Sequence, residues 1–210
     1  MTEVAEQSWR DLVVAYIREE ARPVDKFGHQ PRLYALASRL AGEESKGGLS
    51  CDDDVLFAAA WMHDLGVFLG HRPSDPAELA AWDHVPYTIA KSTEMLRSWG
   101  FPEGKLAAVA EAIRTHQPKD DAVSPEAIVL RDADILEQLG AVGALRALVK
   151  VGRDSRYSTF SDVVPVLERA VQTLPGQLRL KPAQELARER VKVLGELLAA
   201  IQAETGNWLC

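Results

Sequence analysis

Apolar residues recur along the chain at the three- and four-residue intervals that are typical of amphipathic helices. The first such stripe consists of Trp9, Leu12, Val13, Tyr16 and Ile17. Glycine and proline residues separate the periodic segments, at positions where helices commonly end. No alternating apolar and polar run of strand length stands out. The pattern therefore predicts an all-α fold of about seven to nine helices.

We expect these helices to form one compact domain over residues 1–210, a length sufficient for one sizeable core. The helical core spans about residues 20–150. An N-terminal helix, residues 3–20, and C-terminal helices within residues 160–205 are expected to pack on that core.

The segment Val55–Met62 is apolar on nearly all sides, which predicts a central, buried helix. Three consecutive aspartates precede this segment, where negative charge suits the positive end of the helix dipole. Gly66 is expected at or just beyond the end of this helix.

Three further segments between residues 66 and 150 can be interpreted from their caps and breakers. Pro73 and Pro76 predict a loop. Asp83 is the expected N-cap of a helix that runs to about residue 99, with Gly100 as its stop. One long helix is expected to begin at Ser124 and to continue towards residue 150.

Composition and charge narrow the functional class. The formal net charge is -7, which argues against a binder of nucleic-acid polymers, since such proteins carry basic surfaces. No apolar run reaches the length of a membrane span, the N-terminus lacks the pattern of a signal peptide, and the two cysteines form no CxxC pair. We therefore expect a cytoplasmic protein that binds neither nucleic-acid polymers nor membranes; a homodimer stays open.

The strongest chemical feature is His63-Asp64 at the end of the apolar central helix. A buried carboxylate costs several kcal/mol unless it is paired or bound to a metal. The C-terminal end of a helix also disfavours negative charge. The alternative is that His63 caps the last carbonyls of the helix while Asp64 points to solvent.

Three other residues are candidates for the same site as this pair. His29 lies in the first turn of a predicted helix, where it could also be a surface residue. Asp132 and Asp134 lie within another apolar helix. Residues two apart do not share a helix face, so one of these aspartates can point into the core while the other points away.

The ordered set His29, His63-Asp64 and Asp134 resembles the H…HD…D signature of the HD-domain superfamily. The segment beginning at His29, HQPRL, is similar to the H-x-x-R-V segment of the small bacterial HD-domain hydrolases. The segment RDADILEQLGAVG, residues 131–143, resembles their D-A-D-R-L-E-x-L-G-A-x-G block, and the C-terminal helix is similar as well. The resemblance covers almost the whole chain.

The resemblance implies that His29, His63, Asp64 and Asp134 bind a divalent metal ion, with Asp132 behind them or as an alternative ligand. Imidazole and carboxylate ligands together suit Mn²⁺, Fe²⁺, Co²⁺, Ni²⁺ or Zn²⁺. Mg²⁺ fits less well, because it prefers oxygen ligands and retained waters.

His84, His116 and Arg32 are the candidates for contact with a substrate. HD-type proteins often place extra histidines at comparable positions, where they line the pocket or bind a second metal. His116 could instead interact with a helix dipole, and Arg32 could form a surface ion pair rather than bind phosphate. His71, in a predicted loop, is interpreted as a surface residue.

The implied activity is metal-dependent phosphohydrolysis of a nucleotide or other small phosphate ester or anhydride by a metal-activated water. In this mechanism Asp64, His84 and His116 are the catalytic residues. Ile135 stands where relatives commonly carry a basic residue, so a catalytically weak regulatory module that binds nucleotide or metal is the alternative. A third alternative is an oxygenase with two irons.

Overall fold

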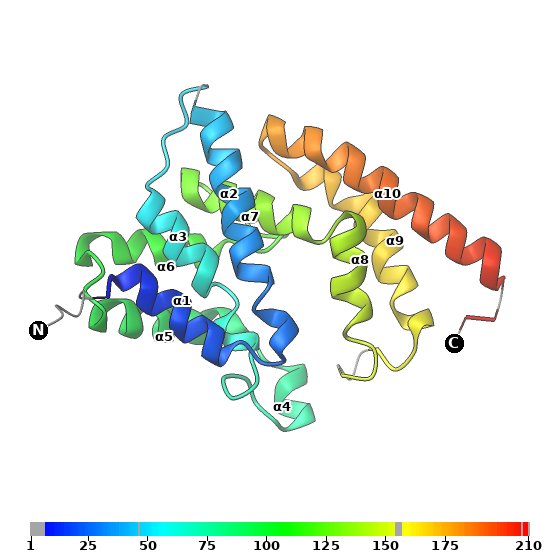
Figure 1. The fold of residues 1–210 in the computed structure, drawn as a ribbon, viewed down its shortest axis with the longest axis horizontal. Coiled ribbons are helices and arrows are strands. Elements are labelled where there is room, and N and C mark those ends of the chain that lie inside the picture. Colours follow the sequence, from blue (N-terminus) through cyan, green and yellow to red (C-terminus); the bar gives the residue numbers. More distant parts are fainter. Residues whose placement is uncertain (1–6, 46, 154–156, 207, 210) are drawn as a thin grey trace, which may run out of the picture. The chain divides into compact units, whose positions relative to one another are not determined.

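A computed structural model describes residues 7–45, 47–153, 157–206 and 208–209 (Figure 1). The described residues contain ten α-helices, five short 3-10 helices and no strand, which confirms the all-α prediction. Residues 3–6 of the predicted N-terminal helix lie outside the described part. None of the helices within these ranges is both long enough and apolar enough to cross a membrane.

The chain divides into two compact units, which are described separately. The first comprises Met1–His116 and Asp120–Leu130, and the second comprises Gln117–Lys119 and Arg131–Cys210. Helix α7 (Pro125–Glu137) is continuous across the division. The single domain expected from the sequence stays a prediction.

The first unit is built around one central helix. Helix α3 is that centre, since α1, α2, α5 and α6 all pack on it. Every residue from Val55 to Met62 is buried, as the uniformly apolar sequence predicts. The elements of this unit are α1 (Trp9–Glu20), η1 (Val24–Lys26), α2 (His29–Ser45), α3 (Asp53–Met62), η2 (Leu65–Val67), α4 (Pro76–Ala80), α5 (His84–Ser98), η3 (Glu103–Lys105), α6 (Leu106–Arg114) and the first part of α7.

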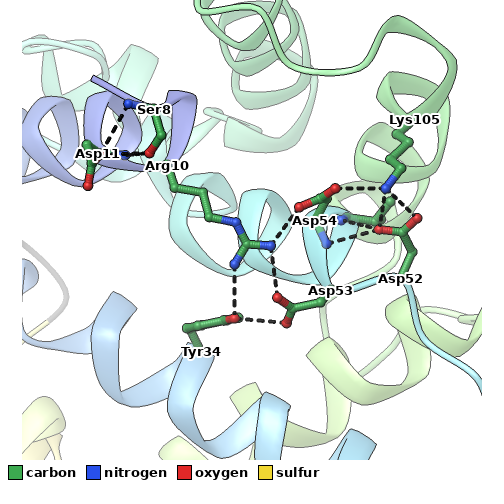
Figure 2. Close-up of polar contacts among 9 residues, drawn as sticks. Ser8, Arg10, Asp11, Tyr34, Asp52, Asp53, Asp54 and Lys105 are labelled. Carbon is green, nitrogen blue, oxygen red and sulfur yellow. Dashed lines mark hydrogen bonds and ion pairs between the residues drawn. The ribbon is translucent and has the colours of Figure 1, made fainter. Parts of the chain in front are cut away.

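The N-terminal end of α3 is held by a network of ion pairs, shown in Figure 2. Asp52 caps the helix by accepting hydrogen bonds from the backbone N–H groups of Asp54 and Val55. Lys105 Nζ lies 2.7 Å from Asp52 and 2.8 Å from Asp54. Arg10 Nη2 lies 2.8 Å from Asp53 Oδ2 and 2.6 Å from Asp54 Oδ1. Two cations thus stabilise three adjacent carboxylates.

The second unit consists of the rest of α7, α8 (Gly140–Leu148), η4 (Phe160–Asp162), α9 (Val164–Thr173), η5 (Pro175–Gln177) and α10 (Lys181–Thr205). Helices α8, α9 and α10 pack on one another. Their shared core contains Ala144, Val163, Leu167 and Leu194.

The structure corrects two boundaries, which explains why it exceeds the expected seven to nine helices. The predicted loop around Pro76 contains the short helix α4, which Asp75 caps by accepting hydrogen bonds from Ala77 and Glu78. The long helix expected towards residue 150 breaks after Glu137. Gly140 adopts a φ of +71°, a left-handed conformation that ends regular helix and that glycine tolerates best.

Candidate metal centre

Three of the predicted ligands lie together in the first unit. His29 is the first residue of α2, His63 is the C-cap of α3, and Asp64 follows it directly. His29 Nε2 lies 3.3 Å from His63 Nε2 and 3.9 Å from Asp64 Oδ2, and His63 Nε2 lies 3.6 Å from Asp64 Oδ1. Both imidazoles are almost completely buried. The packing of α2 on α3 creates this cluster.

This spacing fits a shared cation. Two ligand atoms that each lie about 2.1 Å from one ion are separated by roughly 3–3.5 Å. The separation of 3.3 Å between the imidazole nitrogens is within that range, and the carboxylate distances exceed it by at most a few tenths of an ångström. Two imidazole nitrogens this close share either a proton or a cation, because two lone pairs alone would repel each other.

Backbone contacts orient two of the site's imidazoles. His63 Nδ1 lies 3.0 Å from the Ala60 carbonyl, and His116 Nδ1 lies 2.6 Å from the Ile113 carbonyl. A carbonyl only accepts, so the Nδ1 atom of each ring carries the proton. Each Nε2 atom then presents a lone pair, which is the form that binds a metal.

A second group of potential ligands shares Asp64 with the first. Suitable ligand atoms of Asp64, His84 and His116 lie within 4.8 Å of one another. His84 is the first residue of α5, and its Nε2 is 4.0 Å from Asp64 Oδ1. The helix begins there because Asp83 accepts a hydrogen bond from the Val85 N–H, the cap that the sequence predicted. His116 lies two residues beyond the end of α6. Asp64 therefore stands between two sets of imidazoles.

The electrostatic environment keeps Asp64 ionised. Burial is the largest single influence and by itself raises the pKa of this carboxyl, because it disfavours the charged form. Attraction to nearby groups that can carry positive charge outweighs burial, and the pKa of Asp64 is held well below its ordinary value. These groups are His63, His29, Lys26 and His116. An ionised carboxylate is the form that a metal requires.

Asp134 belongs to the second unit, so its position relative to this cluster is not described. Within its own unit, Asp134 Oδ2 accepts a hydrogen bond from Gln138 Nε2 at 3.2 Å. Arg146 Nη1 lies 3.8 Å from Asp134 Oδ1. The role of Asp134 as a metal ligand stays a prediction.

Asp132, two residues earlier on α7, is fully buried and holds the start of α10. Its Oδ2 accepts hydrogen bonds from the backbone N–H groups of Arg179 and Leu180 at 2.8 and 2.7 Å. Burial raises the pKa of Asp132. The neighbouring Arg131 is also buried, and it donates to the carbonyls of Gln177 and Pro118 at 2.8 and 2.6 Å. These contacts give Asp132 a structural task within its unit.

Arg32 lies one turn after His29 on α2 and is exposed. Its predicted contact with phosphate stays a prediction. Lys26, which was not among the predicted site residues, is half-buried on η1. Its charge acts on Asp64, as described above, and its position three residues before His29 was the signal that could have identified it.

The interpretation of His71 as a surface residue is wrong. Its side chain is only 7% exposed. Its Nδ1 lies 2.8 Å from the Tyr87 hydroxyl, and its Nε2 lies 3.0 Å from Glu20 Oε2. The segment after η2 folds back between α1 and α5, which a loop prediction from local sequence does not reveal.

Comparison with known proteins assigns the family. The HD domain model matches residues 27–139, which is more than half of the 210 residues. The chain therefore belongs to the HD-domain family. This match includes all four residues of the H…HD…D set. No curated protein sequence matches the chain.

Solved structures share the fold over nearly the whole chain. Bacillus subtilis YpgQ is 20% identical with a TM-score of 0.72, and the alignment covers 95% of this chain and 97% of YpgQ. The structure of YpgQ in complex with ADP is 19% identical with a TM-score of 0.69, and the alignment covers 95% of this chain and 96% of YpgQ. A protein described as a predicted HD superfamily hydrolase, from an uncultured Thermotogales bacterium, is 23% identical with a TM-score of 0.60, covering 92% and 91%. These similarities show that the chain shares its fold with these proteins.

Proposed function

We propose that this chain is a metal-dependent phosphohydrolase that acts on a nucleotide or another small phosphate ester or anhydride. The observation that carries the proposal is the pair of ligand groups that share Asp64. Every histidine in these groups is buried or nearly so, and a buried cluster of four imidazoles around one carboxylate is hard to explain as a purely structural device.

Each residue has a separate task in the proposed reaction. His29, His63 and Asp64 would hold a divalent cation. Asp134, the last residue of the H…HD…D set, is the proposed fourth ligand. Such a cation lowers the pKa of a water and polarises a phosphoryl oxygen. Asp64 would orient the attacking water or take its proton. His84 or His116 donates a proton to the leaving group or holds the phosphate, since an imidazole can do either near neutral pH.

Two observations support a phosphorylated substrate. Lys26 and Arg32 place positive charge on the segment that carries His29, although the chain is acidic overall. The related YpgQ forms a complex with ADP, which makes a nucleoside phosphate the first substrate class to examine.

The test is a panel of nucleoside mono-, di- and triphosphates incubated with protein that was purified without chelator and loaded with Mn²⁺. Metal analysis of the same protein gives the number of bound ions. We expect release of phosphate or pyrophosphate that is abolished in Asp64→Ala. Asp54→Ala is the matched control, because Asp54 belongs to the ion-pair network at the opposite end of α3.

Nucleotide binding without turnover in this panel would contradict the hydrolase and favour the regulatory module. The isoleucine at position 135 is the feature that favours that alternative, because a fully buried aliphatic side chain cannot supply the charge of the basic residue that relatives commonly carry there. Two bound irons together with oxygen consumption would favour the oxygenase instead.

A further inference from the structure

Gly66 lies against the first turn of α5, which carries His84. A Cβ atom at position 66 would lie 2.8 Å from the His84 carbonyl oxygen, 2.9 Å from Thr88 Oγ1 and 3.0 Å from His84 Cβ. Contacts this short do not occur between such atoms, so any side chain at this position must displace the helix start. The absence of a side chain at Gly66 therefore permits His84 to approach the segment that follows Asp64.

Both backbone polar groups of Gly66 are bound to this same region. Its N–H donates to Thr88 Oγ1 at 3.0 Å, and its carbonyl accepts from Trp82 Nε1 at 2.9 Å. Thr88 is fully buried. Gly66 therefore contacts both Trp82, just before α5, and Thr88, in the second turn of α5. His84 lies between these two contacts in the sequence.

A third connection lies further along the same segment. His71 contacts Tyr87 on α5 through Nδ1 and Glu20 on α1 through Nε2. The segment from η2 to His71 is thereby connected to α5 at several points. His84 Nε2 lies 4.0 Å from Asp64 Oδ1 across this packed region.

We propose that Gly66 and Thr88 are positioning residues that fix His84 at its distance from Asp64. The inference rests on the proposed function only where it assigns His84 to metal or substrate. It predicts that these two residues control the affinity of the ligand group formed by Asp64, His84 and His116, although neither of them has a side chain that reaches a metal.

The position of His84 can be measured without metal. In metal-free protein labelled with ¹³C-histidine, the ring resonance of His84 is assigned by its loss in His84→Ala. We expect that resonance to shift in Gly66→Ala and in Thr88→Val, which removes the acceptor but keeps the shape. It should stay at the wild-type position in Thr88→Ser, which retains the hydroxyl. Gly42→Ala is the glycine control, because a Cβ there meets no atom within 4 Å.

The consequence for metal binding is measured by calorimetric titration with Mn²⁺. Gly66→Ala and Thr88→Val should weaken the affinity for the Mn²⁺ ion whose binding requires His84 by about 10- to 100-fold. This is the usual effect of losing a residue that orients a metal ligand. Thr88→Ser and Gly42→Ala should bind Mn²⁺ as the wild-type protein does. Circular dichroism establishes that each variant is folded.

An unchanged His84 resonance in both Gly66→Ala and Thr88→Val would overturn the proposal, whatever the metal titrations show. If Gly66→Ala does not fold, the Thr88→Val and Thr88→Ser pair decides the question alone. By contrast, a wild-type Mn²⁺ titration in His84→Ala would show that His84 binds no Mn²⁺ and would overturn the predicted effect on metal affinity, while the resonance would still test the positioning of His84. The hydrolase proposal is tested separately by the nucleotide panel.

Discussion

Both ends of α3 carry carboxylates, three at the N-terminal end and Asp64 alone beyond the C-terminal end, but the groups that surround them differ. At the N-terminal end, Asp52 and Asp54 contact the permanent cation Lys105, and Asp54 also contacts Arg10 (Figure 2). At the C-terminal end, Asp64 faces imidazoles at 3.6 to 4.0 Å. The helix dipole favours negative charge at the first end and disfavours it at the second.

This difference separates three carboxylates that are already paired with cations from one carboxylate that lies among imidazoles. Lysine and arginine keep their charge at neutral pH, so the N-terminal carboxylates are already neutralised and need no ion. Imidazole, unlike lysine or arginine, can be neutral and then presents a lone pair, so a cation is a partner that would satisfy both the histidines and Asp64. Charge count alone does not distinguish the two ends; the chemistry of the neighbours does.

The largest expected effect is at the C-terminal end. Asp64→Asn keeps the shape of the side chain but removes its charge and basicity, and we expect kcat to fall by about 10²- to 10⁴-fold. Asp54→Asn should leave kcat unchanged. The measurement is steady-state hydrolysis of the best nucleotide from the substrate panel. Equal losses in both variants would mean that the two ends do not differ in function.

The next effect concerns stability with metal. Saturation with Mn²⁺ at 100 times its Kd should stabilise the folded chain by about 2.7 kcal/mol. For a chain of this length that corresponds to a rise in Tm of roughly 5–10 °C. A thermal melt with and without chelator measures it. The rise should vanish in His63→Ala and persist in Asp52→Ala; a rise that survives in His63→Ala would place the ion elsewhere.

Asp52→Ala should give a smaller effect of a different kind. It removes the N-cap of α3, so the free energy of unfolding should fall by about 0.5–2 kcal/mol. Urea denaturation of the metal-free protein measures the change. Mn²⁺ affinity should remain that of the wild-type protein, and a weakened affinity would show that the two ends of the helix are coupled.

The smallest expected effect concerns how stability depends on pH. The hydrogen bond from Lys105 is the main cause that lowers the pKa of Asp52. The pKa of Asp54 is lowered first by the hydrogen bond from Arg10 and then by the one from Lys105. Carboxyls with a lowered folded-state pKa stabilise the fold above their unfolded pKa, near 4, and lose that contribution as the pH falls below it. Lys105→Met should therefore be slightly less stable than wild type at pH 7.

The two proteins should converge in stability as the pH falls through the folded-state pKa values of these aspartates. Urea midpoints measured from pH 7 to pH 2 provide the comparison. A constant difference across that range would mean that Lys105 acts through packing of its aliphatic chain rather than through charge.

Most of the fold follows from local sequence. The central position of α3, the cap at Asp83 and the end of α5 before Gly100 were all predicted from apolar pattern and capping residues. The break after Glu137 was not predicted. The apolar periodicity continues through that region, and only the conformation of Gly140 reveals the turn.

The sequence predicted which residues gather at the candidate site better than it predicted the packing around them. A motif order identifies His29 and His63-Asp64 because ligand chemistry restricts which side chains can serve. It does not identify His71, whose partners Glu20 and Tyr87 are 51 and 16 residues away. Nor does it identify Gly66, since a glycine after a helix is ordinarily explained by its cap. Long-range packing decides both positions.

The contacts of Arg131 bear on the order in which the protein is made. Its carbonyl acceptors come from Pro118, 13 residues earlier, and Gln177, 46 residues later, and Asp132 binds backbone N–H groups later still. Buried charges require such partners. On a ribosome, α7 therefore emerges well before the segment that anchors it, and the second unit can complete these contacts only when synthesis has passed Leu180.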